Sequence, residues 1–397
     1  MKHVFVYDEY EIKKIPRAIN INSERILRFS KISFIWIINF LIFISSCNAQ
    51  KTFYRYTPPP DLNDGLKVAS TESVGIDKND LEILTQRILS GNSGYLRSLI
   101  LIKNGHLIYE GFFHGALRDD RYTIYSVSKT FTSALIGIAI DKGFIKTVDQ
   151  PMLPFFPEYK NMINDPLKKN IKIHHLLSLS SGIDWDESTY SYEDRRNIHV
   201  QMEMTNDWIR FILQRPMRDK PGDRWLYNTG NVQLLSAIIK KATGLYLHEF
   251  AEKHLFGPLK IENYYWNTDP SGYTCAGGSD GGLRLKARDV AKLGCLYTNK
   301  GMWNGKRILS EAWIEKSTRG YITTRRDSQY GYLWRVGIDK TYEQPYKFFY
   351  HTGSGGHLLM VYPELNLVVV INSGPNSFRP IVRSVLDMVV RNVNKSN

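Results

Sequence analysis

Strand-like patterns of hydrophobic residues lie near both ends of the chain. Residues 96–103 and 106–113 form two such runs, separated only by Asn104-Gly105, the pair most typical of a two-residue β-hairpin. Near the other end, strand-like runs cover residues 348–350, 358–362 and 367–372, and a turn at 363–366 joins the last two. The pattern therefore predicts paired strands at both ends of the folded body.

Between these two sets of strands the spacing of apolar residues is mostly helical. Helices are predicted at 128–142, 171–181, 205–215, 230–243, 246–255, 287–299 and 310–317. Two more are predicted outside this region, one from an Asp77 N-cap to about Leu89 and one over 379–393. The regular strand–helix alternation of a parallel sheet is absent. We therefore expect an α+β fold in which N- and C-terminal strands build one antiparallel sheet, flanked by helices, beside a mostly helical middle region.

The first part of the chain is predicted to be an export leader. Residues 32–44 form an apolar run that follows basic residues and is shorter than the ~20 residues of a membrane-spanning helix. It ends in Ser45-Ser46-Cys47, which resembles the lipobox of bacterial lipoproteins, whose cysteine is acylated. An uncleaved anchor, or plain secretion with Cys47 unmodified, is the alternative. The stretch before Arg25 is long and acidic for a leader, so a misplaced start codon or an unusual leader stays open.

The expected organisation is a leader at 1–46, a lipoprotein tether at 47–69 and one folded domain at 70–397, with a helical subdomain at about 145–290. Three consecutive prolines at 58–60 favour a stiff, extended tether. Such a chain would be an exported bacterial lipoprotein, bound to a membrane through its lipid on the periplasmic side or at the cell surface.

Composition narrows the classes of partner. The net charge is +13, from 52 Lys and Arg against 39 Asp and Glu, but the basic residues are scattered and form no nucleic-acid-binding module. A nearby anionic membrane or wall polymer explains the charge equally well, and without such a module we expect no nucleic-acid partner. Three cysteines exclude a four-cysteine zinc site, and pairing of Cys275 with Cys295 stays open. His248 and His254 lack the spacing of a metalloprotease motif, so no metal or cofactor is expected.

A serine and a lysine at the start of one predicted helix could carry chemistry. Ser126 precedes the apolar helical pattern, and Lys129 lies one turn later on the same face. The positive end of the helix dipole favours negative charge at such a serine. A lysine held against an apolar helix can lose its proton and act as the base for that serine. Ser126 is the only serine in the chain with a lysine three residues later, although a capping serine and a surface lysine would give the same pattern.

Two further segments contain residue types that could take part in catalysis. Tyr227 lies in a turn just before a predicted helix, where a phenol can relay a proton between a nucleophile and a leaving group. The segment 350–357 joins two strand-like runs and contains four residues of interest, His351, Thr352, Gly353 and Ser354. Glycines in a strand allow close approach of a ligand, and a free strand-edge N–H can stabilise an oxyanion. A core tyrosine and a glycine-rich hairpin turn are the alternative interpretations.

Taken in order, Ser-x-x-Lys, the tyrosine and His-Thr-Gly resemble the serine β-lactamase-related family. This family includes class C β-lactamases, penicillin-binding DD-peptidases, esterases and 6-aminohexanoate-dimer hydrolases. The resemblance covers about residues 70–393 and extends to supporting segments at 173–183, 221–227 and 279–294. The segment Trp-Asp-Glu-Ser-Thr-Tyr at 185–190 looks most like the aminohexanoate-oligomer hydrolase and esterase branch.

The resemblance implies a role for each matching residue. Ser126 would be the acylated nucleophile, Lys129 its base and Tyr227 the proton relay. His351, Thr352 and Gly353 would occupy the place of the family's Lys-Thr-Gly strand. The backbone N–H groups of Ser126 and Ser354 would form the oxyanion hole.

The chain departs from the family pattern at two positions. Thr229 stands where the family's Tyr-x-Asn motif has its asparagine, and His351 replaces the lysine of Lys-Thr-Gly. Both changes weaken recognition of a penicillin-like carboxylate, because an amide and a fixed cation are lost. The resemblance therefore implies an esterase or amidase rather than a dedicated β-lactamase.

The sequence also allows two other interpretations of its function. Residues 277–281 match the Gly-x-Ser-x-Gly elbow of α/β-hydrolases, but the strand and helix that this elbow needs are not predicted around it. A non-catalytic protein that binds cell-wall fragments would keep the same fold. Trp185, Tyr190 and Tyr192 are expected to line an acyl pocket.

The resulting expectation is a serine hydrolase that cleaves ester or amide bonds through an acyl-enzyme. Its partner would be a small ester, amide or short peptide-like molecule, and a β-lactamase or DD-peptidase acting on peptidoglycan-type substrates is the alternative. The sequence leaves the oligomeric state open.

Overall fold

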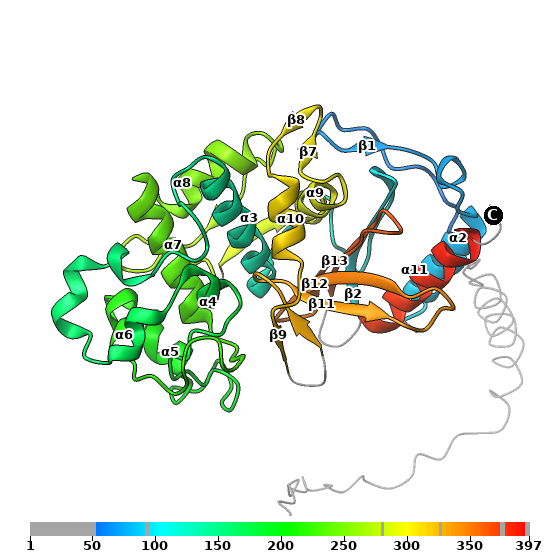
Figure 1. Cartoon of the computed structure of the whole chain (residues 1–397). Helices are drawn as coiled ribbons and strands as arrows, with labels where there is room; N and C mark the ends of the chain where they lie inside the picture. Colours follow the sequence, from blue (N-terminus) through cyan, green and yellow to red (C-terminus); the bar gives the residue numbers. More distant parts are fainter. Residues whose placement is uncertain (1–52, 92–94, 279–281, 325–327, 374–377, 394–397) are drawn as a thin grey trace, which may run out of the picture. The chain divides into compact units, whose positions relative to one another are not determined.

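The computed structural model describes residues 53–91, 95–278, 282–324, 328–373 and 378–393 (Figure 1). Residues 54–397 form one compact unit. The predicted leader and the predicted lipidation site Cys47 lie outside the described residues, so both stay predictions. No helix in the described ranges is both long enough and apolar enough to cross a membrane.

A nine-stranded sheet forms the centre of the body, in the spatial order β1-β3-β2-β14-β13-β12-β11-β10-β9. Its strands are β1 (Lys67–Val68), β2 (Leu96–Lys103), β3 (His106–Phe112), β9 (Ile322–Thr323), β10 (Gln329–Tyr330), β11 (Arg335–Asp339), β12 (Tyr346–Gly353), β13 (His357–Tyr362) and β14 (Leu367–Ser373). All neighbours pair antiparallel except β1 and β3, which pair parallel. The expected α+β fold, with one sheet built from both ends of the body, is confirmed.

The β2–β3 hairpin forms as its turn sequence predicts. Asn104 and Gly105 have φ angles of 51° and 74°, the left-handed backbone that a two-residue hairpin of this type requires. Lys103 consequently pairs with His106. β14 then pairs with β2 and joins the C-terminal strands to this hairpin.

Helices cover both faces of the sheet. Every residue of β13 and of β14 is buried, as expected for strands enclosed on both sides. On one face, α2 (Lys78–Leu89) and α11 (Phe378–Val393) lie side by side and pack on Leu99, Leu101 and Val369 (Figure 1). On the other face, α9 (Ala287–Thr298) packs against β13 and β14, and the same apolar core continues into the helical region.

The helices largely follow the predicted pattern. They are α2 (Lys78–Leu89), α3 (Ser128–Asp141), α4 (Ile173–Leu177), α5 (Ile198–Glu203), α6 (Trp208–Gln214), α7 (Thr229–Thr243), α8 (Leu247–Ala251), α9 (Ala287–Thr298), α10 (Glu311–Ser317) and α11 (Phe378–Val393). Short helical turns are η1 (Glu72–Val74), η2 (Tyr125–Val127), η3 (Leu153–Phe155), η4 (Pro157–Met162), η5 (Pro166–Asn170) and η6 (Glu252–Phe256). The helix expected over 171–181 is shorter than predicted, because Leu179 adopts a left-handed φ of 53° and ends helical geometry.

Small sheets were not predicted from the sequence. β4 (Arg121–Thr123), β6 (Leu283–Lys286) and β5 (Tyr265–Trp266) form one, and β7 (Met302–Trp303) with β8 (Lys306–Arg307) forms another. Their strands are two to four residues long, too short for an alternating pattern to be recognised.

Residues 54–69 pack on the body, unlike the extended tether expected over 47–69. Tyr56 donates its hydroxyl hydrogen to the Ile108 carbonyl at 2.9 Å. Asp64 accepts from the buried guanidinium of Arg288 at 2.7 Å. Because these partners lie far along the chain, local composition could not indicate that folded structure begins before residue 70.

Candidate active site

Ser126 lies in a tight helical turn that leads into α3. Tyr125 has a left-handed φ of 45°, and the Val127 N–H donates to the Ile124 carbonyl at 3.1 Å, which closes the turn η2. The turn leaves the Ser126 side chain half-buried at the N-terminal end of α3, where the helix dipole favours negative charge.

Lys129 lies one turn into α3, and no part of it is exposed to solvent. Its Nζ is 3.1 Å from Ser126 Oγ and 3.2 Å from Thr229 Oγ1, and it also donates to the Gly277 carbonyl. The pairing of Ser126 with Lys129 that their spacing suggested is therefore present in the structure. An amine at this distance can accept the serine proton once it is neutral.

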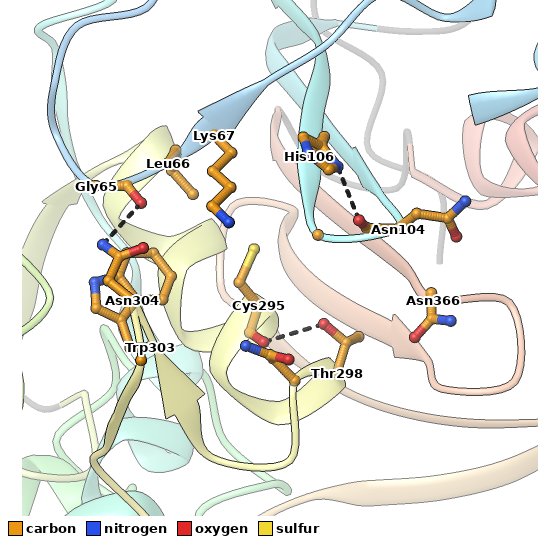
Figure 2. Close-up of a pocket in the computed structure, with 13 residues that line it drawn as sticks. Gly65, Leu66, Lys67, Asn104, His106, Cys295, Thr298, Trp303, Asn304 and Asn366 are labelled. Atoms are coloured by element: carbon orange, nitrogen blue, oxygen red, sulfur yellow. Dashed lines mark hydrogen bonds between the residues drawn. The ribbon is translucent and has the colours of Figure 1, made fainter. Parts of the chain in front are cut away.

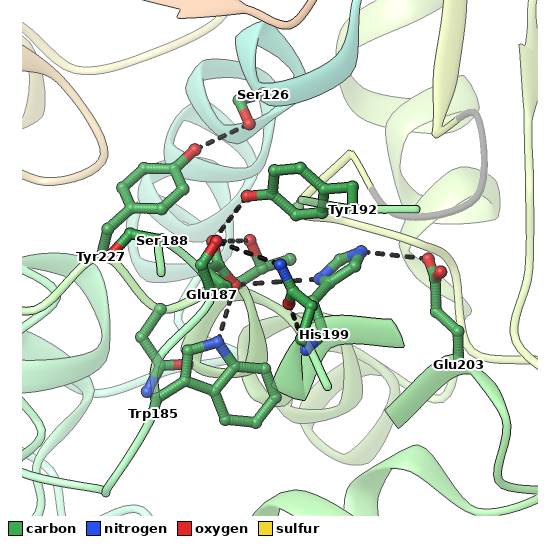
Figure 3. Close-up of polar contacts among 12 residues, drawn as sticks. Ser126, Trp185, Glu187, Ser188, Tyr192, His199, Glu203 and Tyr227 are labelled. Carbon is green, nitrogen blue, oxygen red and sulfur yellow. Dashed lines mark hydrogen bonds and ion pairs between the residues drawn. The ribbon is translucent and has the colours of Figure 1, made fainter. Parts of the chain in front are cut away.

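Tyr227 approaches the same serine from the turn before α7. Its hydroxyl is 2.7 Å from Ser126 Oγ (Figure 3). Lys129 Nζ lies 4.9 Å from the centre of the Tyr227 ring. The next residue, Asn228, caps α7 by accepting from the Asn231 N–H at 2.9 Å. Helix capping thus occupies the amide oxygen of Asn228, and the side chain that contacts the lysine is that of Thr229.

The end of β12 forms the other wall of the site. A Cβ added at Gly353 would lie 2.3 Å from the Ile124 carbonyl oxygen, so this strand end packs directly on the turn that carries Ser126. Ser354 follows and is exposed, and Thr352 is half-buried. The structure thus brings the His-Thr-Gly-Ser segment beside the Ser-Lys-Tyr cluster.

His351 is buried and points away from solvent. Its Nδ1 is 2.9 Å from the Thr352 carbonyl, which can only accept, and its Nε2 is 3.3 Å from the Tyr330 hydroxyl. This network assigns the ring hydrogen to Nδ1. Burial, with the nearby cations of Arg335 and Lys129, holds the pKa of His351 well below its usual range, so the side chain is neutral.

Glu187, which the sequence pattern did not indicate, contacts Thr229, which in turn contacts Lys129. Its carboxylate is buried and accepts from Trp185 Nε1 at 2.7 Å and from the Thr229 hydroxyl at 2.8 Å (Figure 3). Nothing in the sequence distinguishes it from its neighbour Asp186, which is exposed. Only the fold, which sets Glu187 against the start of α7, could identify it.

Arg335 of β11 was also not predicted. Its guanidinium carbon lies 6.0 Å from the centre of the Tyr227 ring and 5.7 Å from that of Trp225. Among the described residues, no carboxylate lies within ion-pair distance of it. One arginine among 52 basic residues gives no signal in the sequence, and only the pairing of β11 with β12 brings it to the site.

The expectation that Trp185 lines an acyl pocket is wrong. This side chain is fully buried and bonded to Glu187, so it belongs to the core. Tyr190 and Tyr192 are partly exposed, and Tyr190 stacks under the Arg196 guanidinium at 4.3 Å. The serine of the Gly-x-Ser-x-Gly match, Ser279, lies outside the described residues.

The remaining chemistry-bearing residues lie apart from this cluster. Cys275 and Cys295 are buried and do not form a disulfide bond, and burial raises the pKa of the Cys295 thiol to about 12, which keeps it unreactive. Cys295 lines a separate cavity of about 380 Å³ with Lys67 and His106 (Figure 2), and none of the predicted site residues lines it. Across the described ranges no three His, Cys, Asp or Glu side chains are grouped to hold a metal ion.

Comparison with known proteins gives consistent matches. The chain is 25% identical over 240 residues to a 6-aminohexanoate-dimer hydrolase of Paenarthrobacter ureafaciens, covering 56% of this chain and 57% of that protein. It is 25% identical over 151 residues to esterase EstB of Burkholderia gladioli, covering 36% of this chain and 38% of EstB. The chain thus spans little more than half the length of the first of these relatives.

Solved structures share the fold. A penicillin-binding protein homologue from Pyrococcus abyssi matches with a TM-score of 0.59 and 22% identity, covering 79% of this chain and 77% of that one. EstCE1, a hydrolase with promiscuous acyltransferase activity, matches with a TM-score of 0.63 and 17% identity, covering 79% and 97%. The model of the Beta-lactamase family matches residues 97–383, well over half of the sequence. The chain belongs to the Beta-lactamase family.

Proposed function

We propose that this protein is a serine hydrolase that cleaves ester or amide bonds through a covalent acyl-enzyme on Ser126. The observation that carries the proposal is the convergence of two proton-transfer groups on one hydroxyl. Lys129 Nζ lies 3.1 Å and the Tyr227 hydroxyl 2.7 Å from Ser126 Oγ. A base and an acid that both contact a half-buried serine at a helix N-terminus are typical of nucleophilic catalysis.

The first half-reaction forms the acyl-enzyme. Neutral Lys129 takes the Ser126 proton as Oγ attacks the substrate carbonyl carbon. The carbonyl electron pair moves onto oxygen, which the backbone N–H groups of Ser126 and Ser354 are proposed to stabilise. When the tetrahedral intermediate collapses, Tyr227 donates its proton to the leaving oxygen or nitrogen and regains one from the Lys129 ammonium. Water then attacks the acyl-enzyme by the same steps in reverse.

The substrates are proposed to be small esters, amides or short peptide-like molecules. The relatives named above, a 6-aminohexanoate-dimer hydrolase and an esterase, act on molecules of this kind by their names. His351 is neutral, so it does not supply the charge of the lysine that it replaces. This supports an esterase or amidase over a dedicated β-lactamase.

Arg335 favours a second candidate, a peptidase acting on peptidoglycan-type substrates. Its guanidinium lies beside Tyr227 and has no carboxylate partner among the described residues. A fork of N–H donors suits a substrate carboxylate. Amide substrates with a free carboxylate near the scissile bond are therefore proposed to be better substrates than neutral ones.

The location of the protein in the cell is also a proposal. The lipobox-like Ser45-Ser46-Cys47 supports an exported lipoprotein anchored to a membrane, periplasmic or at the cell surface. We also propose no nucleic-acid partner, because the basic residues are scattered along the sequence. The competing interpretation, a protein that binds wall fragments without turnover, would leave the contacts of Ser126 without a catalytic use.

Steady-state hydrolysis tests the proposal. Purified protein and its Ser126→Ala variant would be assayed with 4-nitrophenyl butyrate, the linear dimer of 6-aminohexanoate, an acyl-D-alanyl-D-alanine peptide and nitrocefin. Turnover of the ester or an amide that disappears in Ser126→Ala supports the proposal. Turnover of nitrocefin alone would favour a β-lactamase, and no turnover by folded protein would favour a binding protein.

A further inference from the structure

The Glu187 carboxylate is surrounded by hydrogen-bond donors. Oε1 accepts from the hydroxyls of Thr229 at 2.8 Å and Tyr192 at 3.3 Å. Oε2 accepts from Trp185 Nε1 at 2.7 Å and from the Thr229 N–H at 3.0 Å. The loop that carries Glu187 is fastened by Asn197, whose side chain donates to the Glu187 carbonyl at 3.3 Å. The carboxylate is therefore held in one orientation.

This arrangement fixes the direction of the Thr229 hydroxyl. A hydroxyl has one hydrogen, and an ionised carboxylate can only accept, so that hydrogen points to Glu187. The Thr229 oxygen consequently presents only lone pairs to Lys129 Nζ, 3.2 Å away. Thr229 can accept a hydrogen bond from the lysine but cannot donate one to it.

The other contacts of Lys129 determine which neighbour its lone pair faces. The Gly277 carbonyl can only accept, as Thr229 does, so these two acceptors take two hydrogens from Nζ. A neutral amine has two hydrogens and one lone pair. When Lys129 is neutral, the lone pair is therefore left facing its third neighbour, Ser126 Oγ, at 3.1 Å.

We infer that Glu187 is a positioning residue, which aims the Lys129 lone pair at Ser126 by holding the Thr229 hydroxyl as an acceptor. The inference rests on the proposed function, because it gives Lys129 the role of base. Without the carboxylate, the Thr229 hydroxyl is free to turn and donate to the amine, which would occupy the lone pair that the nucleophile needs.

Replacing Glu187 with glutamine would reverse the direction of the hydrogen bond between this residue and the Thr229 hydroxyl. The size of the side chain would not change. Its NH₂ group cannot replace Oε2, because Trp185 Nε1–H and the Thr229 N–H can only donate. It must replace Oε1, where both neighbours are hydroxyls that can accept. The Thr229 oxygen would then accept from the new amide, and its hydrogen would be released toward Lys129.

The experiment compares Glu187→Gln, Thr229→Val, Thr229→Ser and the double variant Glu187→Gln/Thr229→Val. Readouts are kcat and KM on an ester substrate and the rate of inactivation by a fluorophosphonate. We expect Glu187→Gln and Thr229→Val each to lower kcat and the inactivation rate by about 10- to 100-fold, with KM within about twofold, because only proton transfer is impaired. Thr229→Ser keeps the hydroxyl and should retain at least about a third of the activity. The double variant should be no slower than the slower single variant.

Glu203→Gln is the matched control. Glu203 contacts His199 Nε2 at 3.0 Å on the far side of the histidine from Glu187, so this variant should match the unmodified protein (Figure 3). Unchanged kcat in folded Glu187→Gln, or multiplicative effects in the double variant, would overturn the inference. If Glu187→Gln does not fold, equal kcat in Thr229→Val and the unmodified protein would overturn it. Absence of labelling in the unmodified protein would instead contradict the proposed function.

Discussion

The two walls of the site differ in how their polar groups are engaged. On the helical wall, Lys129, Tyr227, Thr229 and Glu187 contact one another or the serine, and three of them are buried. On the strand wall, Thr352 and Ser354 are at least partly exposed, and Arg335 has no carboxylate partner among the described residues. Under the proposed function, we assign proton transfer to the helical wall and substrate recognition to the strand wall.

The strongest challenge to the helical wall is Lys129→Met, which keeps the length of the side chain and removes the amine. We expect kcat to fall by about 10⁴-fold or more on every substrate, because the base is lost. Thermal unfolding would show that the variant is folded. Activity within tenfold of the unmodified protein would mean that another group is the base.

Tyr227→Phe removes one hydroxyl and leaves the ring under Lys129. The expected loss is about 10²- to 10³-fold in kcat, and larger for amides than for activated esters, because amide nitrogen needs a proton to leave. The measurement is kcat for matched ester and amide substrates. Equal losses on both would argue against a role in leaving-group protonation.

The strand wall is tested by Arg335→Gln. Here kcat/KM should fall about tenfold for substrates with a carboxylate and change less than twofold for neutral ones, since a recognition charge is removed. Arg87→Gln, an exposed arginine on α2, is the control and should change neither. A uniform loss on all substrates would place Arg335 with the proton-transfer groups instead.

The smallest expected effect concerns His351 and pH. Its pKa is low in the folded protein, so below pH ~6.5 the unfolded chain binds a proton that the folded protein does not. Stability should therefore fall as pH drops below ~6.5, with this residue contributing a slope of up to about 1.4 kcal/mol per pH unit. In His351→Gln, urea unfolding between pH 7 and 5 should show a shallower decline. An unchanged decline would mean that His351 is protonated in the folded state.

Local signals in the sequence predicted the parts of the fold that depend on neighbouring residues. Asn104-Gly105 identified the β2–β3 hairpin, and the spacing of Ser126 and Lys129 identified a pair on one helix face. Glu187 and Arg335 were missed because their partners lie 42 or more positions away, at Thr229 and Tyr227 respectively. Only the folded chain determines such contacts, and a buried carboxylate looks like an exposed one in the sequence.

The most direct test of the account is to locate the reactive serine. Purified protein would be treated with a fluorophosphonate and digested, and the added mass would be mapped. We predict a label on the Ser126 peptide that is lost in Lys129→Met. A label on the Ser279 peptide, or none on folded protein, would contradict it.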